Sequence, residues 1–329
     1  MKTQIVYALV ASPEDTFLEE LWASVFSLRI YEPDREVRVL CDEHTAEYAR
    51  KFPSFIDLLT ELVVISLPEH YTKKERSRAI KTSIRQNVVG KFLFVDTDTI
   101  FAGTLEYIDN LKCELAAVPE YHSSFSDYPF RDFVLERSIR FFNTDVSDAE
   151  RWHNSGVLFV NDSPLAYEFY NQWNDNWKYA AFKKGNSQDQ PALLKTDKDM
   201  GYVIQELPGE YNCQMAMGMK YFADAKIIHY LHFDLLPKPK HPFLDKSIYK
   251  QIKEEGGISE KIAYTIRHCK AAFITPSCMI DGEAVEFLLS NPGHVFMAIA
   301  KHGGWMLSLT NKIAAVFAKI LKYKGIKIW

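Results

Sequence analysis

Short apolar segments alternate with segments of helical periodicity along most of the chain. The apolar run at residues 4–11, "QIVYALVA", precedes a helical pattern for which Ser12 is the expected N-cap. Further apolar runs occupy 36–42 and 62–68, and a helical pattern covers about 75–89. Strands that alternate with helices at this spacing predict βαβ units and a mostly parallel sheet. We therefore expect an α/β fold whose sheet is flanked by helices.

Four more strands are expected, and then the pattern stops. The proline-rich stretch at 235–243, "LLPKPKHPF", ends the alternation, and the remainder reads as helical. We place a domain boundary near residue 245, which separates a catalytic α/β domain at 1–245 from a helical C-terminal region at 246–329. The four additional strands are expected at 114–120, 155–161, 201–208 and 225–232.

Composition narrows the kinds of protein this chain can be. Of its 329 residues 47% are apolar and 25% are charged, which is ordinary for a globular protein. A net charge of −4 and a pI of about 6.2 argue against nucleic acid as a partner. The five cysteines form no CxxC pair, and no signal peptide is expected at the start of the sequence, so we predict a cytoplasmic protein with reduced thiols.

The C-terminal end of the chain differs from the rest in its charge. No acidic residue follows Glu286, whereas six lysines do. In a helix over 305–322, six apolar side chains would share one side, opposite Lys312, Lys319 and Lys322. These six are Leu309, Ile313, Val316, Phe317, Ile320 and Leu321. This pattern fits a helix lying on an anionic membrane surface on the cytoplasmic side, and it also fits a helix docked on the protein core.

The segment at 91–101, "KFLFVDTDTIF", places Asp96 and Asp98 directly after a buried strand. Open α/β sheets bind their ligands beyond the carboxyl ends of their strands. Residues two apart in a strand point to the same side, so both carboxylates could converge on one ion. Hard oxygen donors suit Mn²⁺ or Mg²⁺, which usually complete their shell with substrate phosphates. A loop in which the carboxylates cap backbone amides is the alternative.

"LFVDTDTIF" resembles the DxD segment of the GT-A-fold glycosyltransferases, most nearly the retaining, glycogenin-like and bacterial galactosyltransferase-like group. The resemblance runs in order from residue 4 to about 240. It implies a GT-A fold, with both aspartates binding Mn²⁺ and the diphosphate of a nucleotide sugar.

Two further stretches are similar to segments of the same family. "HNSGVLFVN" (153–161) looks like the segment that lines the donor-sugar pocket, which implies substrate contacts from Asn154, Ser155 and Gly156. "SQDQPALL" (187–194) resembles the segment beside the anomeric carbon. It implies that Asp189 orients sugar hydroxyls and that Gln190 lies near the reacting centre. The 187–194 stretch alone predicts a helix N-terminus, where the dipole favours an aspartate.

The resemblance also implies residues around the diphosphate and the acceptor. The family's third metal ligand is a histidine after a late strand, which points to His229, with His232 as the alternative. Lys238 would contact the diphosphate, although the glycine that the family has between the histidine and this lysine is missing. Upstream, Arg78 and Lys81 would contact the donor. Asn212, in "LPGEYNCQ" (207–214), would face the acceptor.

We thus expect a glycosyltransferase that moves a hexose from a UDP-sugar to a glycan, with retention of configuration. The tail suggests a lipid-linked oligosaccharide of a bacterial surface polysaccharide as acceptor. One alternative is a haloacid-dehalogenase-like phosphatase, whose strand-DxDxT pattern the segment also satisfies, with Asp96 as nucleophile. That reading needs a second acidic pair, for which "KTDKDMG" (195–201) is the nearest candidate. A nucleotide-sugar-binding protein without catalysis is another alternative.

Overall fold

The structure is a computed structural model that describes residues 2–215, 220–231, 241–271, 287 and 290–323. By its contacts the chain divides into two compact units, Met1–Met279 and Ile280–Trp329. The boundary expected near 245 falls inside the first unit, and as a statement about domains it stays a prediction.

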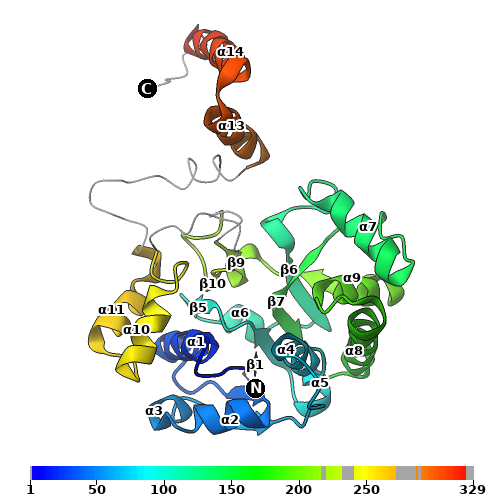
Figure 1. The fold of residues 1–329 in the computed structure, drawn as a ribbon, viewed down its shortest axis with the longest axis vertical. Helices are drawn as coiled ribbons and strands as arrows, with labels where there is room; N and C mark the ends of the chain where they lie inside the picture. Colours follow the sequence, from blue (N-terminus) through cyan, green and yellow to red (C-terminus); the bar gives the residue numbers. More distant parts are fainter. Residues whose placement is uncertain (1, 216–219, 232–240, 272–286, 288–289, 324–329) are drawn as a thin grey trace. The chain divides into compact units, whose positions relative to one another are not determined.

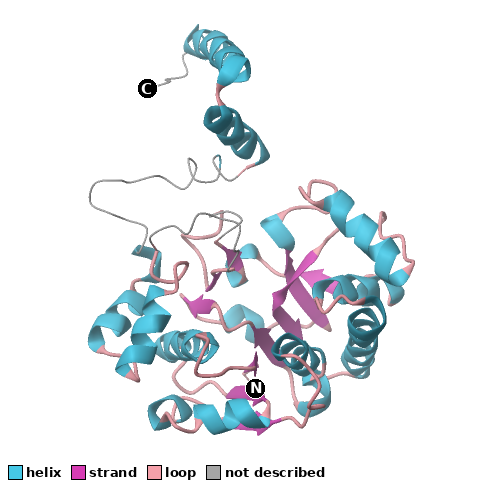
Figure 2. Ribbon diagram, in the orientation of Figure 1, coloured by secondary structure: helices cyan, strands magenta, loops and turns pink. Residues whose placement is uncertain are grey.

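The first unit is built on a seven-stranded sheet with the order β3-β2-β1-β4-β7-β6-β8. Every neighbouring pair is parallel except those made by β7, which runs antiparallel to both β4 and β6. The expected α/β fold with a mostly parallel sheet flanked by helices is confirmed (Figure 2). The strands of this sheet are β1 (Gln4–Leu9), β2 (Val37–Cys41), β3 (Glu61–Val64), β4 (Phe92–Val95), β6 (Leu115–Pro119), β7 (His153–Val160) and β8 (Ile204–Glu206).

A second, three-stranded sheet has the order β5-β10-β9, with β10 antiparallel to β5 and parallel to β9. Because β5 follows β4 after only three residues, this small sheet lies next to the end of the central strand. Its strands are β5 (Thr99–Phe101), β9 (Cys213–Gln214) and β10 (Ile227–His229).

The two faces of the large sheet are covered by different helices, because side chains alternate along each strand. On one face, Tyr7 and Leu93 pack in a core with α1, α2, α3, α6, α10 and α11. On the other face, Val6 and Phe94 pack with α4, α5, α8 and α9. These helices are α1 (Phe17–Tyr31), α2 (Glu43–Ala49), α3 (Pro53–Ile56), α4 (Lys73–Thr82), α5 (Ile84–Asn87), α6 (Glu106–Asp109), α8 (Pro164–Lys184) and α9 (Gln190–Asp199).

The remaining helices of the first unit are peripheral. Figure 1 shows α10 and α11 beside α1, with which both are in contact, and α7 beside α8 and α9. Short 3-10 turns lie at the ends of β6 and β8 and after α11. The elements are α7 (Arg131–Phe142), α10 (Ser247–Glu255), α11 (Glu260–Arg267), η1 (Glu120–His122), η2 (Gly209–Tyr211) and η3 (Cys269–Ala271).

One local expectation was wrong. Helix α1 begins at Phe17, and its N-cap is Thr16, four residues after the cap expected at Ser12. Ser12 instead forms a turn, in which its backbone N and its hydroxyl donate to the Asp15 carboxylate at 3.1 and 3.0 Å. The physical reason is that the Asp15 carboxylate competes for the donors at this position, as aspartate often does in turns.

The second unit, described by itself, contains α13 (Asn291–His302) and α14 (Gly304–Tyr323). Large apolar side chains of α14, including Trp305, Val316 and Phe317, are exposed, as are Lys312 and Lys319. The side chains of Leu321 and Lys322 and all of 324–329 lie outside the described residues. Among the helices that the structure describes, none has the length and apolar character to span a membrane.

Candidate active site

Two half-buried carboxylates lie at the carboxyl end of the central strand. All four residues of β4 are buried, and Asp96 and Asp98 follow directly. The turn is held from both sides, because the Asp96 backbone N donates to Gly156 O at 2.7 Å and the Thr99 hydroxyl donates to Asp96 O at 2.9 Å. The pair therefore occupies the strand end expected from the sequence.

A histidine from the small sheet completes a group of possible metal ligands. Asp96, Asp98 and His229 each offer a ligand atom, and these atoms all lie within 4.8 Å of one another. His229 is 1% exposed, and its Nε2 lies 3.1 Å from Asp98 Oδ1. Two carboxylates and an imidazole within this distance fit Mn²⁺ or Mg²⁺. We call Asp96, Asp98 and His229 the DDH group.

Gly156 leaves the space in which the DDH group converges. A Cβ at this position would lie 2.3 Å from His229 Cε1 and 2.8 Å from Asp96 Oδ2. Separations this short do not occur between such atoms, so any side chain at 156 would displace a member of the group. Antiparallel β7 brings Gly156 here because its first residues lie beside the last residues of β4.

The DDH group also shapes the protonation of its histidine. Burial alone would lower the pKa of His229, but the carboxylates of Asp98, Asp96 and Glu120 raise it above its ordinary value. A cation at this position would compete with a proton for Nε2.

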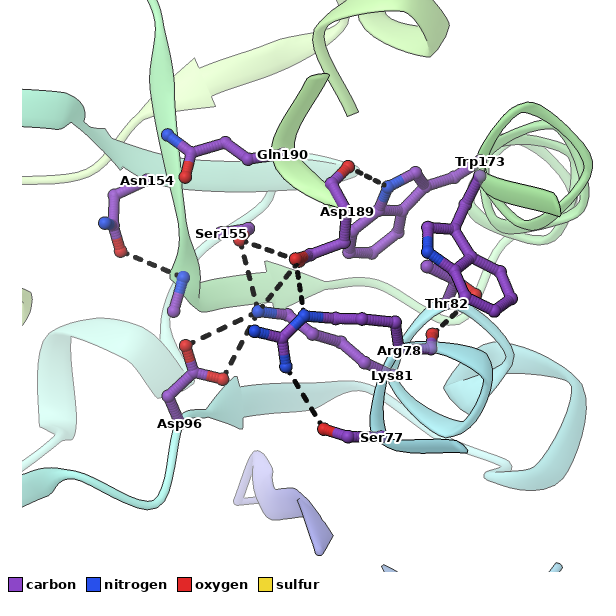
Figure 3. Close-up of polar contacts among 12 residues, drawn as sticks. Ser77, Arg78, Lys81, Thr82, Asp96, Asn154, Ser155, Trp173, Asp189 and Gln190 are labelled. Atoms are coloured by element: carbon purple, nitrogen blue, oxygen red, sulfur yellow. Dashed lines mark hydrogen bonds and ion pairs between the residues drawn. The ribbon is translucent and has the colours of Figure 1, made fainter. Parts of the chain in front are cut away.

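A second group of charges surrounds Asp189 (Figure 3). Arg78 Nε lies 2.8 Å from Asp189 Oδ1, and Lys81 Nζ lies 3.1 Å from Asp189 Oδ2. The Ser155 hydroxyl donates to the same Oδ2 at 2.9 Å, and Lys81 donates to Ser155 Oγ at 3.1 Å. We call Arg78, Lys81, Ser155 and Asp189 the Asp189 group. Lys81 Nζ also lies 3.2 Å from Asp96 Oδ1, so it joins this group to the DDH group.

The Asp189 carboxylate is buried, with 5% of the residue exposed. Burial would raise its pKa, but Lys81 and Arg78 hold the pKa well below its ordinary value. Asp189 is the N-cap residue of α9, yet its side chain turns to the two cations and not to the helix. The indole N–H of Trp173 in α8 donates to Asp189 O at 3.1 Å and holds this turn in place. The position at a helix N-terminus is thus confirmed, and the side chain belongs to the site.

A third set of side chains is uncharged except for one carboxyl. Asn154 Nδ2 and Gln190 Nε2 both donate to Glu120 Oε2, at 2.9 and 2.6 Å. Asn212 is fully buried and donates to Asn154 Oδ1 at 2.9 Å. Burial raises the pKa of Glu120. The structure thus brings Asn154, Gln190 and Asn212 together, with Asn212 inside the protein.

Glu120 was missed in the sequence. It follows the fully buried strand β6, in "AVPE", as Asp96 follows β4. The same signal, an acidic residue directly after a buried strand, could have identified it. Its partners belong to segments that the sequence did single out, 153–161 and 187–194.

Two of the site residues expected from the sequence are outside the part of the chain that the structure describes, and the phosphatase alternative finds no support in it. Lys238 and His232 lie outside the described residues. The acidic pair that a phosphatase would need at 195–201 lies in α9, where Asp197 accepts from Ile204 N and sits 3.9 Å from His153 Nδ1. Among the described residues, Asp197 is not a member of the group around Asp96.

This fold is that of the GT-A glycosyltransferases, as comparison with solved structures shows. No protein-family model matches the sequence. No curated protein matches it either. The fold assignment rests on the galactosyltransferase LgtC, solved in complex with donor and acceptor sugar analogs, which superposes with a TM-score of 0.50. The two sequences are 14% identical, and the match covers 80% of this chain and 99% of LgtC.

Two other glycosyltransferases superpose less well. The apo form of GlyE from Streptococcus pneumoniae TIGR4 has a TM-score of 0.47 at 16% identity, over 81% of this chain and 64% of GlyE. Mouse xyloside xylosyltransferase 1 has a TM-score of 0.45 at 12% identity, over 70% of this chain and 97% of that protein.

Proposed function

We propose that this protein is a metal-dependent glycosyltransferase that moves a hexose from a nucleotide-diphosphate sugar, expected to be a UDP-sugar, to a glycan acceptor. One observation carries the proposal. The DDH group and the Asp189 group meet through Lys81 at the carboxyl end of β4, where open α/β sheets bind ligands. Such a site combines a place for a cation with further positive charge, as a diphosphate requires.

In this proposal Asp96, Asp98 and His229 would hold Mn²⁺ or Mg²⁺, and a cation bound there would supply positive charge to offset the negative charge on the leaving diphosphate. Lys81, 2% exposed, and Arg78 add fixed positive charge on the donor side. We assign the donor sugar to Asn154, Ser155, Gly156 and Asp189, with Gln190 near the anomeric carbon. Lys238 stays a proposed diphosphate contact.

The state of Asp189 supports retention of configuration. An inverting enzyme needs a carboxylate base, and Asp189 is the carboxylate that the resemblance of 187–194 places beside the anomeric carbon. In the structure both of its oxygens contact protein groups, and its pKa is held low. A carboxylate with a low pKa is a poor general base. Asp189 is therefore better suited to hold sugar hydroxyls than to take a proton from the acceptor.

The test is calorimetric titration of UDP into the protein with and without Mn²⁺, on the wild type and on Asp98→Asn. Binding that needs both Mn²⁺ and Asp98 is expected. Asp57→Asn, which changes an exposed carboxylate after α3, is the matched control and should bind as the wild type does. Absence of UDP binding with and without Mn²⁺ would contradict the proposal. Mg²⁺-dependent phosphate release from a generic monoester would favour the phosphatase instead.

For the acceptor we propose a lipid-linked glycan, such as an oligosaccharide of a bacterial surface polysaccharide, reached from the cytoplasmic face of the membrane. The support is α14, which exposes Trp305, Val316 and Phe317 together with Lys312 and Lys319. Exposed apolar and cationic side chains on one helix favour binding to anionic lipid surfaces.

Deleting residues 305–329 should abolish sedimentation with anionic vesicles while leaving hydrolysis of the sugar donor within about twofold of the full chain, because the catalytic groups lie in the first unit. Neutral vesicles are the control, since they lack the charge that attracts lysines. Equal sedimentation of the full and shortened chains would contradict the membrane role. Lost donor hydrolysis would contradict the separation of tail and site.

A further inference from the structure

A buried row of polar side chains connects Glu120 with the histidine of the DDH group. Glu120 Oε2 accepts from Asn154 Nδ2 at 2.9 Å, and Asn154 Oδ1 accepts from Asn212 Nδ2 at 2.9 Å. Asn212 Oδ1 lies 3.0 Å from His229 Nδ1. The four side chains come from η1 directly after β6, from β7, from the turn before β9 and from β10, and none is more than 7% exposed.

The donor and acceptor roles in this row of hydrogen bonds are set at Asn154. The Gly156 backbone N–H can only donate, and it donates to Asn154 Oδ1 at 2.9 Å. Asn154 must therefore turn its NH₂ group to Glu120, whose Oε2 accepts it. An amide has one acceptor oxygen and one donor nitrogen, so each contact fixes the next.

The same donor and acceptor argument applies to His229. Asn212 gives its NH₂ group to Asn154 Oδ1, which leaves its own carbonyl oxygen to face His229 Nδ1. That oxygen can only accept, so the hydrogen bond requires a proton on Nδ1. Nε2, which faces Asp98, is then the nitrogen that can give its lone pair to a cation. The partner of one ring nitrogen generally decides which nitrogen is free to bind a metal.

We propose that Glu120, Asn154 and Asn212 act as positioning residues that hold the His229 ring with its proton on Nδ1 and with Nε2 directed to the cation site. This inference rests on the proposed metal site. It adds Glu120 and Asn212 as residues that act through His229, and it gives Asn154, already assigned to the donor sugar, a second role. We call these three positioning residues the amide relay.

The experiment uses the full chain with ¹⁵N-labelled histidine and Zn²⁺ as a diamagnetic probe. The His229 signals are identified by their loss in His229→Asn. On addition of Zn²⁺, the proton on Nδ1 should persist and any proton on Nε2 should disappear. Coordination of Zn²⁺ through Nδ1 would overturn the proposal, because the relay would then not direct the ring.

Asn212→Leu removes the acceptor for Nδ1 while keeping a side chain of similar size. We expect the Nδ1 proton to exchange rapidly with water and the Kd for Zn²⁺ and for Mn²⁺ to rise 10- to 100-fold, as second-shell changes typically do. Asn174→Leu is the matched control, because Asn174 is 9% exposed and its Nδ2 donates to Thr82 Oγ1 at 2.7 Å outside the relay. A Kd in Asn212→Leu that equals the wild-type value would overturn the proposal.

Asn212→Asp keeps an acceptor opposite Nδ1 but removes the NH₂ group that donates to Asn154 Oδ1, and it is the second variant in case the leucine variant misfolds. We expect this variant to keep the Nδ1 proton, and its loss would contradict the relay. The result is separable from the proposed function. UDP binding with Mn²⁺ tests the function, whereas the position of the histidine proton is read without any nucleotide.

Discussion

The two charged groups of the site balance their charges in different ways. In the Asp189 group a buried carboxylate contacts two cations and a hydroxyl, so its charge is balanced by the protein alone. The DDH group brings two half-buried carboxylates and an imidazole together around a space that Gly156 keeps open. The first arrangement is suited to hold a fixed shape, and the second is suited to receive an added cation. Neighbouring aspartates in one site are thus held in two ways, Asp189 by cations of the protein itself and Asp96 and Asp98 around a space for an added cation.

The largest effect should come from Asp98→Asn, which breaks the DDH group alone. If the cation contributes several kcal/mol to the transition state, the transfer rate should fall by about 10³-fold or more at saturating donor. The measurement is sugar transfer over a range of Mn²⁺ concentrations. A rate within tenfold of the wild type would show that Asp98 is not needed to hold the ion.

Asp189→Asn should disrupt the Asp189 group and lower the free energy of unfolding. Removing one partner of a buried ion pair typically costs about 3–5 kcal/mol of the free energy of unfolding. Here the change leaves Lys81 paired with Asp96 and removes the 2.8 Å ion pair of Arg78. Urea unfolding of the metal-free protein measures the loss. In the same assay Asp98→Asn should change stability by less than about 1 kcal/mol, since the Asp98 side chain is partly exposed. Equal losses in the two variants would contradict the contrast between the groups.

Gly156→Ala tests whether the space in the DDH group is required. The new methyl group would lie 2.3 Å from His229 Cε1, so the ring must move. We expect a loss of about 2 kcal/mol in the free energy of unfolding from overpacking, with weaker Mn²⁺ binding by calorimetry. Gly257→Ala is the matched control, because a Cβ there would meet no atom within 4 Å. Unchanged Mn²⁺ affinity in Gly156→Ala would show that the ring tolerates the methyl group.

The smallest expected effect is the loss of stability at low pH. Because the pKa of Asp189 is held below its unfolded value of about 3.9, its contribution to stability is present above that pH and is lost as the pH falls toward the folded pKa. Between pH 7 and pH 3 the stability advantage of the wild type over Asp189→Asn should shrink by about 1 kcal/mol. Urea midpoints at several pH values measure the difference. An advantage that grows on acidification would contradict the assigned pKa direction.

The sequence predicted the fold, and it singled out several residues that the structure brings together at the end of β4, for a physical reason. Continuous apolar strands and helical periodicity are local patterns, and Asp96 and Asp98 stand out because a charge directly after a buried strand needs a partner. The likeness of 187–194 to a known family segment placed Asp189 and Gln190 in the site, where the structure also has them.

The contacts between distant segments could not be predicted in the same way. Nothing near Asn154 indicates that its amide lies between Glu120 and Asn212, residues 34 and 58 positions away. The antiparallel direction of β7 was also not expected, because βαβ spacing alone predicts parallel neighbours. The start of α1 was misplaced because a local turn at Ser12 competes with the helix cap.

The reversed direction of β7 has a consequence for how the protein is made. Its first residues meet the end of β4 about 60 positions earlier in the chain, and His229 arrives only with β10, which pairs with β5. Contacts between segments so far apart form slowly, since a long loop must close before they are gained. During synthesis from the N-terminus, a chain that ends before β10 contains both aspartates but lacks the histidine. The ability to bind a cation through all three ligands therefore reports that the first unit has been made and folded as far as β10.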